Sequence, residues 1–237
     1  MNTVFKNKLA LVALATALLS APVTRAQFLN FNVDLNTAAL GAQNSANAPF
    51  YLDFQLNYGG STNPATTVTL SNFQFTGGSA MGSATTLGTA SGSMGSTLTL
   101  SASSSSQLNE LYQQFSTGTT DISFTAHVSG AGFDVTPTSL SVAIMDNSLG
   151  SPAQIFTSAP DTESMVFVNI DPTKTASDVQ AYMSVSSADG NTPLSGVVAS
   201  VTPVPEPSTY AAIMGGAAVG VAFLRRRLGK AQLVQAA

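Results

Sequence analysis

Carboxylates are the side chains of this sequence that come closest to a catalytic set, because the chain has no cysteine and only one histidine. Two carboxylates about 5–10 Å apart can hydrolyse a glycosidic bond. Asp34 and Asp53 are expected on strands and Glu110 on a short helix, but no sequence spacing pairs them. Four rings could stack on a sugar, although the chain lacks tryptophan: Tyr51, Tyr58, Tyr112 and Tyr182. We therefore expect a protein that is not an enzyme, and a secreted hydrolase is the least favoured alternative.

The single histidine, His127, supports the same expectation. It falls on the opposite strand face from Phe124 and Val128, as a surface or edge residue would. A Ser–His–Asp triad stays open because Ser and Asp are plentiful, but no Gly-x-Ser-x-Gly elbow supports one. One histidine without cysteine excludes the common zinc arrangements.

Calcium is the one ion that the sequence makes plausible, since it takes oxygen ligands alone. The candidate loops begin at Asp146 (Asp-Asn-Ser) and at Asp189 (Asp-Gly-Asn). Neither has EF-hand spacing. Both are more simply interpreted as Asx turns, which Asp and Asn favour. No other cofactor is expected.

The C-terminal segment combines three elements in a fixed order. A proline-rich stretch at 203–208 precedes an apolar run at 209–224 and a basic tail at 225–237. The prolines keep the first element extended, so an enzyme could bind it as a strand-like peptide. The apolar run, about 24 Å long as a helix, would hold the chain in a bilayer, and the arginines would stay in the cytoplasm. The predicted sorting residues are Val204, Pro205, Glu206, Pro207 and Ser208, and the predicted basic stop is Arg225, Arg226 and Arg227.

The N-terminal residues 1–26 have the pattern of a signal peptide. Lys6 and Lys8 precede the apolar run Leu9–Leu19, which is too short to span a membrane. Small residues near position 26 predict cleavage by signal peptidase after Ala26, with Gln27 as the mature start.

The three C-terminal elements at 203–237 resemble those of the PEP-CTERM family of exported bacterial proteins. The resemblance implies transient anchoring in the inner membrane, processing by an exosortase, and then release to the cell surface or extracellular matrix of a Gram-negative bacterium. The body is also similar to one subgroup of that family, through Phe50–Leu56 (YLDFQL within it), Leu70–Phe73, Leu108–Glu110, Phe115 and Ser123-Phe124. That subgroup has no assigned activity, so the similarity adds architecture rather than chemistry.

Charge separates the body from the two terminal segments. Apart from Lys174, every basic residue lies within 1–26 or 225–237, so the predicted domain at 27–202 is acidic. Nucleic-acid binding is excluded, because it needs clustered Lys and Arg. Anionic lipid or acidic polysaccharide would be repelled unless divalent ions bridged the charges.

Alternating apolar residues predict a mainly β body. Phe50 to Asn57 alternates as a half-buried strand, and a phase change near Ser71-Asn72 predicts a β-bulge. A helix is expected near 107–115, from Leu108, Leu111, Tyr112 and Phe115, and residues 77–96 as a loop or irregular hairpin. About nine short strands favour an antiparallel two-sheet sandwich of jelly-roll type.

These patterns together predict an exported structural or adhesive protein of the envelope or an exopolysaccharide biofilm. The main alternative is a carbohydrate-binding module, which would use Tyr51 or Tyr58. The expected partners are signal peptidase, an exosortase, the inner membrane for a limited time, and exopolysaccharide.

Overall fold

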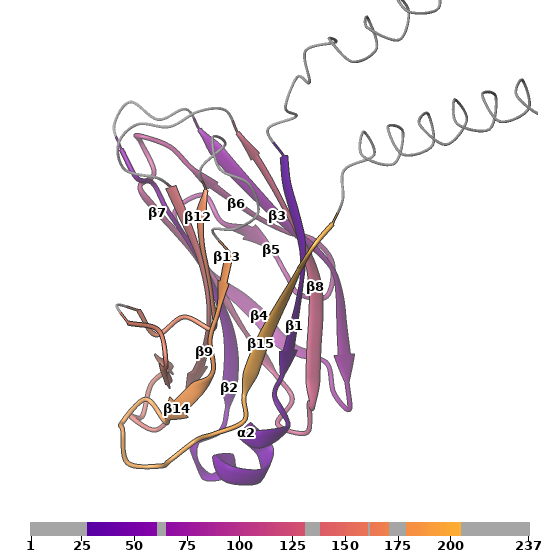
Figure 1. Ribbon diagram of the computed structural model, residues 1–237, viewed down its shortest axis with the longest axis vertical. Coiled ribbons are helices and arrows are strands. Elements are labelled where there is room, and N and C mark those ends of the chain that lie inside the picture. Colours follow the sequence, from indigo (N-terminus) through magenta and orange to yellow (C-terminus); the bar gives the residue numbers. More distant parts are fainter. Residues whose placement is uncertain (1–27, 61–64, 131–137, 161, 171–178, 205–237) are drawn as a thin grey trace, which may run out of the picture.

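The computed structural model describes residues 28–60, 65–130, 138–160, 162–170 and 179–204, and Figure 1 shows them as two facing layers of strands. Sheet A has the order β15-β1-β8-β3-β6-β5. Its strands are β1 (Phe28–Asn36), β3 (Thr66–Thr76), β5 (Ser91–Gly92), β6 (Leu98–Ala102), β8 (Asp121–Gly130) and β15 (Val198–Pro203).

Sheet B has the order β13-β12-β9-β2-β7-β4, with β10 beside β9. Its strands are β2 (Phe50–Asn57), β4 (Ala80–Leu87), β7 (Leu108–Phe115), β9 (Thr138–Asp146), β10 (Ala153–Gln154), β12 (Val166–Ile170) and β13 (Val179–Ala181). A separate pair joins β11 (Phe156–Thr157) to β14 (Ser184–Ser186), and all these pairings are antiparallel. The predicted mainly β, antiparallel class is confirmed.

The two sheets meet across one apolar core, which the alternating strands build. Phe54 of β2 shows the contact between layers: its ring lies 5.9 Å from that of Phe73 and 5.6 Å from that of Phe124, both in sheet A. The three rings are joined by the stacking of Phe73 on Phe124 at 5.2 Å. Such aromatic contacts bury large areas and favour offset or edge-to-face geometry.

The helix expected near 107–115 is wrong, because this segment is strand β7. Its buried residues follow a period of two and include the polar Asn109 and Gln113, whereas Leu108 is exposed. Pairing with β2 on one side and β4 on the other overrides the helical spacing of the apolar residues. The one α-helix of the described residues is α2 (Ala38–Gln43), followed by the 3₁₀ turn η1 (Ser45–Asn47).

Two further expectations concern irregular segments. Residues 77–96, expected as a loop or irregular hairpin, contain the edge strand β4, whose register with β7 shifts between Met81 and Thr85. The predicted bulge is confirmed: β3 shifts register against β8 between Ser71 and Gln74, and Asn72 has φ +58°. Asn tolerates this left-handed backbone better than most residues.

Both ends of the described domain lie at the same end of the sandwich. The last strand, β15, pairs with the first, β1, and the amide of Val204 donates to the carbonyl of Asn30 over 2.9 Å. Figure 1 shows the start of β1 and the end of β15 at this end of the sandwich. The predicted signal peptide and transmembrane segment fall outside the described residues.

Candidate functional site

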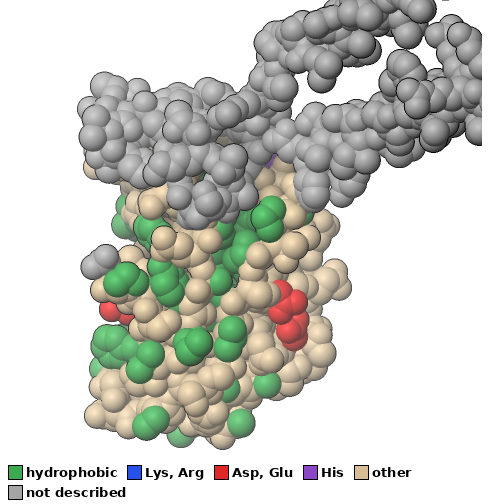
Figure 2. Space-filling view, in the orientation of Figure 1, with side chains coloured by type: hydrophobic (Ala, Val, Ile, Leu, Met, Phe, Trp, Pro, Cys, Tyr) green, Lys and Arg blue, Asp and Glu red, His purple; other side chains and the backbone are tan. Residues whose placement is uncertain are grey.

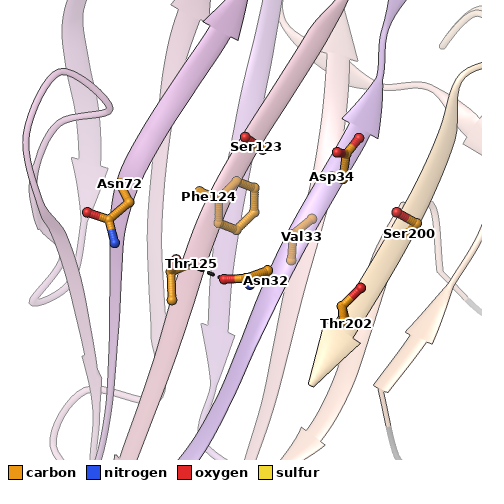
Figure 3. Close-up of a pocket in the computed structure, with 9 residues that line it drawn as sticks. All are labelled: Asn32, Val33, Asp34, Asn72, Ser123, Phe124, Thr125, Ser200 and Thr202. Carbon is orange, nitrogen blue, oxygen red and sulfur yellow. Dashed lines mark hydrogen bonds between the residues drawn. The ribbon is translucent and has the colours of Figure 1, made fainter. Parts of the chain in front are cut away.

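The outer face of sheet A holds an open groove with a volume of about 380 Å³. In Figure 3, β1 runs along its middle, with β15 on one side and β8 and the β3 bulge on the other. Alternation points the polar residues of these strands outward, because Val33 and Leu35 point into the core. The groove is lined by Asn32, Val33, Asp34, Asn72, Ser123, Phe124, Thr125, Ser200 and Thr202.

Amides and hydroxyls dominate the chemistry of this groove. The hydroxyl of Thr125 donates to the Oδ1 of Asn32 over 2.9 Å, across the β1–β8 pair. Asp34 is exposed and supplies the one carboxylate of the lining. Nearby, partial burial and then the negative charge of Asp34 raise the pKa of Asp121 above its usual value. The groove can therefore donate hydrogen bonds to a neutral, hydroxyl-rich ligand and accept hydrogen bonds from it.

The outer face of sheet B contains a carboxylate that is closed off from water. Asp53 is 0% exposed, although its strand alternates and the sequence places it on a polar face. Its Oδ2 accepts hydrogen bonds from the Nε2 of Gln154 over 2.8 Å and of Gln55 over 2.9 Å. Its Oδ1 is buried and has no hydrogen-bond partner. The strand pattern predicts the direction of this side chain but not that neighbouring side chains cover it.

The pKa of Asp53 is raised to about 7, chiefly by burial. The hydrogen bonds from Gln154 and Gln55 oppose this shift, while the negative charge of Glu110 adds to it. Burial acts in this direction because a charged carboxylate loses its hydration inside a protein. No Lys or Arg occurs among the residues that the structure describes, so no cation there compensates the charge.

Strand pairing brings together residues that sequence spacing left apart. Asp53 lies opposite Tyr112, and Gln55 lies opposite Glu110, in the register of β2 with β7. The rings of Tyr51 and Tyr112 meet edge to face, with centroids 5.9 Å apart. Sequence reasoning missed this arrangement because it placed Glu110 and Tyr112 on a helix. The period of two in β7 appears in its burial and not in its sequence, because two of the buried positions are the polar Asn109 and Gln113. Gln154, which comes from the short β10, had no recognisable signal.

The two candidate calcium loops are joined to each other by hydrogen bonds. Oδ1 of Asp146 accepts from the backbone N and the hydroxyl of Ser148, and its Oδ2 accepts from Asn44 at 2.8 Å. Ser148 then accepts from the amide of Asp189 over 3.0 Å. Both loops form Asx turns, since the amides of Ser148 and Asn191 bond to the carboxylates two residues earlier. No group of three or more metal-binding side chains occurs in the described part of the chain.

Hydrogen bonding also lowers the pKa of Asp189, chiefly through the hydroxyl of Ser187. Its carboxylate thus stays ionised while held by O–H and N–H donors. A calcium ion at this site would have to displace those donors, so calcium binding remains a prediction without geometric support.

His127 lies on the outer face of sheet A, as its strand phase predicts. It is half-buried, whereas Phe124 and Val128 of the same strand are buried. Its Nδ1 hydrogen-bonds to the Oδ1 of Asn30, the residue opposite it on β1. The partner at Nδ1 is thus a side-chain amide rather than the carboxylate of a Ser–His–Asp triad.

Of the predicted sorting residues, the structure describes only Val204, which is half-buried at the end of β15. The others lie beyond the described residues, as do the predicted cleavage site at Ala26-Gln27 and the basic stop. Within the described ranges, no helix is long and apolar enough to cross a membrane.

Comparison with known proteins gives one finding, at this C-terminal end. Residues 203–227 match the model of the PEP-CTERM protein-sorting motif. No curated protein and no solved structure matches the chain significantly. The match starts at Pro203, the last residue of β15, so the motif follows the sandwich without a spacer. The chain therefore carries a PEP-CTERM sorting motif, which identifies it as an exported protein that an exosortase processes.

Proposed function

We propose that this protein is a non-enzymatic adhesive component of the bacterial envelope or polysaccharide matrix, and that it holds neutral polysaccharide in the groove of sheet A. The observation that carries the proposal is the groove lining, in which side-chain amides and hydroxyls line an open surface. Sugar hydroxyls act as both donors and acceptors, and Asn, Ser and Thr side chains complement them.

Charge supports a neutral ligand over an acidic one. The described residues include no Lys or Arg, and in the view of Figure 2 the described surface shows acids and apolar side chains but no basic ones. A polyanion would be repelled in the absence of bridging divalent ions. The exported destination that the sorting motif indicates is compatible with a polysaccharide matrix.

Binding to neutral and acidic polysaccharides tests the molecular role. We expect the exported protein to be retarded in gels that contain a neutral glucan but not in gels that contain polygalacturonate. Replacing both Asn32 and Thr202 with Ala should weaken this retardation about three- to tenfold, because each removes a hydrogen-bonding group. Thr99→Ala, on the same sheet but outside the groove lining, is the matched control. Equal binding by the double variant and the parent would contradict the groove assignment.

Processing tests the predicted roles of the C-terminal segments. We propose that Pro205, Glu206 and Pro207 are the recognition element, that 209–224 holds the chain in the inner membrane, and that Arg225–Arg227 fixes the cytoplasmic end. Glu206→Ala should then be exported but remain a full-length, membrane-bound precursor. Deletion of 205–237 should release the body instead. Fractionation of a host with an exosortase distinguishes these outcomes, and normal release of the Glu206 variant would contradict this assignment.

A further inference from the structure

The outer face of sheet B presents a second set of polar and aromatic side chains, on the opposite layer from the groove. The register of β2 with β7 and β9 sets their positions: Tyr51 lies opposite Gln114 and Met145, and Asp53 lies opposite Tyr112 and Ala143. Because neighbouring strands are about 4.8 Å apart, these side chains form one continuous surface.

The aromatic pair at this surface remains accessible. Tyr51 and Tyr112 are half-buried, in contrast to the core rings Phe50 and Phe54, which are 0% exposed. Their edge-to-face contact fixes both rings on the sheet. A rigid aromatic ring with a polar hydroxyl provides contact area at little entropic cost, which suits the apolar face and the hydroxyl edge of a pyranose.

Two carboxyl groups lie beside the rings. Glu110 is half-buried, and it receives the Nε2 of Gln55 over 3.5 Å, a long hydrogen bond that leaves acceptor capacity. Asp53 lies underneath, with a buried oxygen that no donor reaches. A buried polar atom without a partner is costly and calls for an explanation. A ligand cannot reach this covered oxygen, but a hydroxyl-rich ligand would supply donors to Glu110 beside it, whereas an anion would be repelled.

We propose that the outer face of sheet B is a second binding surface for neutral sugar chains, on which Tyr51 and Tyr112 contact the sugar ring and Glu110 accepts hydrogen bonds from its hydroxyls. Asp53 is a positioning residue, because it is fully buried and acts through Gln55 and Glu110. The surface shares its ligand class with the proposed function but no residue with the groove.

Calorimetry with a neutral β-linked glucose hexasaccharide tests this surface. We expect Tyr51→Ala and Tyr112→Ala each to weaken binding about five- to tenfold. Tyr112→Phe, which keeps the ring, should lose less. Tyr182→Ala is the matched control, since Tyr182 lies beyond β13 and hydrogen-bonds to Gln180. Because the chain has no tryptophan, sugar should also protect its tyrosine emission from iodide quenching.

The pH dependence of sugar affinity tests the role of Asp53, because structural damage alone would not change it. Asp53→Asn keeps the acceptor for Gln55 and Gln154 but cannot ionise, so sugar affinity should become independent of pH between 5 and 8. The parent should lose affinity over that range as Asp53 becomes charged beside Glu110 and the two groups repel each other. An unchanged pH profile in the Asp53 variant would contradict the positioning role.

The same binding measurements can overturn either proposed sugar-binding surface while leaving the other. Loss of all binding in the Asn32 and Thr202 double variant, with normal binding by the tyrosine variants, would overturn the sheet B surface and leave the groove. The reverse result would overturn the groove and leave sheet B. A parent protein that binds neither the hexasaccharide nor a neutral glucan would overturn both.

Discussion

Asp34 and Asp53 occupy equivalent positions in two alternating strands, yet they differ in exposure to solvent on the two outer faces of the sandwich. Asp34 lies between Val33 and Leu35 in β1, and it is exposed at the groove of sheet A. Asp53 lies between Leu52 and Phe54 in β2 and is 0% exposed. Both side chains point away from the core, so the alternating pattern of their own strands does not distinguish them.

The neighbouring strands make the difference. Asp34 lies opposite Ser123 and Ser200, whose short side chains leave it open to water. Asp53 lies between Tyr112 and Ala143, and the small Ala143 leaves room for Gln154 to reach over β9 and bond to it. An alternating strand thus predicts which way a side chain points, while residues distant in sequence decide whether it meets solvent.

The largest expected effect comes from a change in the core that lies between the two sheets. Phe54→Ala deletes a fully buried ring that contacts Phe73 and Phe124 across the two sheets. We expect the free energy of unfolding to fall by about 3–5 kcal/mol, since a cavity replaces the ring. Urea denaturation measures this loss. A loss under 1 kcal/mol would show that the two sheets do not depend on this contact.

A change of pH should separate the two faces. Between about pH 4 and 7 the unfolded chain ionises Asp53 while the folded chain keeps it protonated, so stability should fall as the pH rises and level off above 7. The ionisable groups facing Asp53 are Glu110, Tyr51 and Tyr112. Asp53→Asn should remove most of this fall, leaving the smaller part that the raised pKa of Asp121 contributes, and should be about 2–4 kcal/mol more stable than the parent at pH 8.

Asp34→Asn is the control for that measurement. Its carboxylate is exposed, so the variant should keep the parent's decline in stability between pH 4 and 7. Melting curves at several pH values compare the three proteins. A decline that disappears in the Asp34 variant and persists in the Asp53 variant would reverse the comparison.

A smaller effect should follow from the Asp146 cluster. Asp146→Ala leaves the side chain of Asn44 and the backbone amide of Ser148 without their acceptor, and we expect a loss of about 1–3 kcal/mol. Because donors already occupy this carboxylate, millimolar calcium should not raise the melting temperature of the parent. A rise with calcium that Asp146→Ala abolishes would instead support the calcium site.

The smallest effect concerns the hydroxyl groups of sheet A. Thr125→Ala removes one hydrogen bond to Asn32 at an exposed site, so stability should change by about 0.5 kcal/mol or less. Sugar binding in the groove is the property that should respond. A stability loss above 2 kcal/mol would mean that the groove face is structural rather than available to a ligand.

Local patterns predicted much of the fold. Two of these patterns can be read from consecutive residues: the alternation from Phe50 to Asn57, which predicts a strand, and the phase change at Ser71-Asn72, which predicts a bulge. Both predictions are confirmed. The error at β7 arose because Leu108, Leu111, Tyr112 and Phe115 have helical spacing. The deciding residues were Asn109 and Gln113, whose burial depends on distant partners: Asn109 accepts from Thr89, and Gln113 accepts from the amide of Met94.

The candidate sites were less predictable for the same reason. The groove forms because β1, β8 and β15 lie side by side, and Asp53 lies near Glu110 because of the register of β2 with β7. Both depend on pairings between segments far apart in the chain, which a period of two does not encode. The sorting motif, in contrast, lies within a single short segment and could be identified directly.

The pairing of the first strand with the last has a consequence for the timing of export. A chain that crosses a membrane from its N-terminus exposes β1 first, but the edge of β1 that binds β15 stays empty until Pro203 has crossed. The sorting motif begins at that same residue. Completion of sheet A and arrival of the sorting motif are therefore nearly simultaneous, so a chain released early would carry an unpaired strand edge that is open to aggregation.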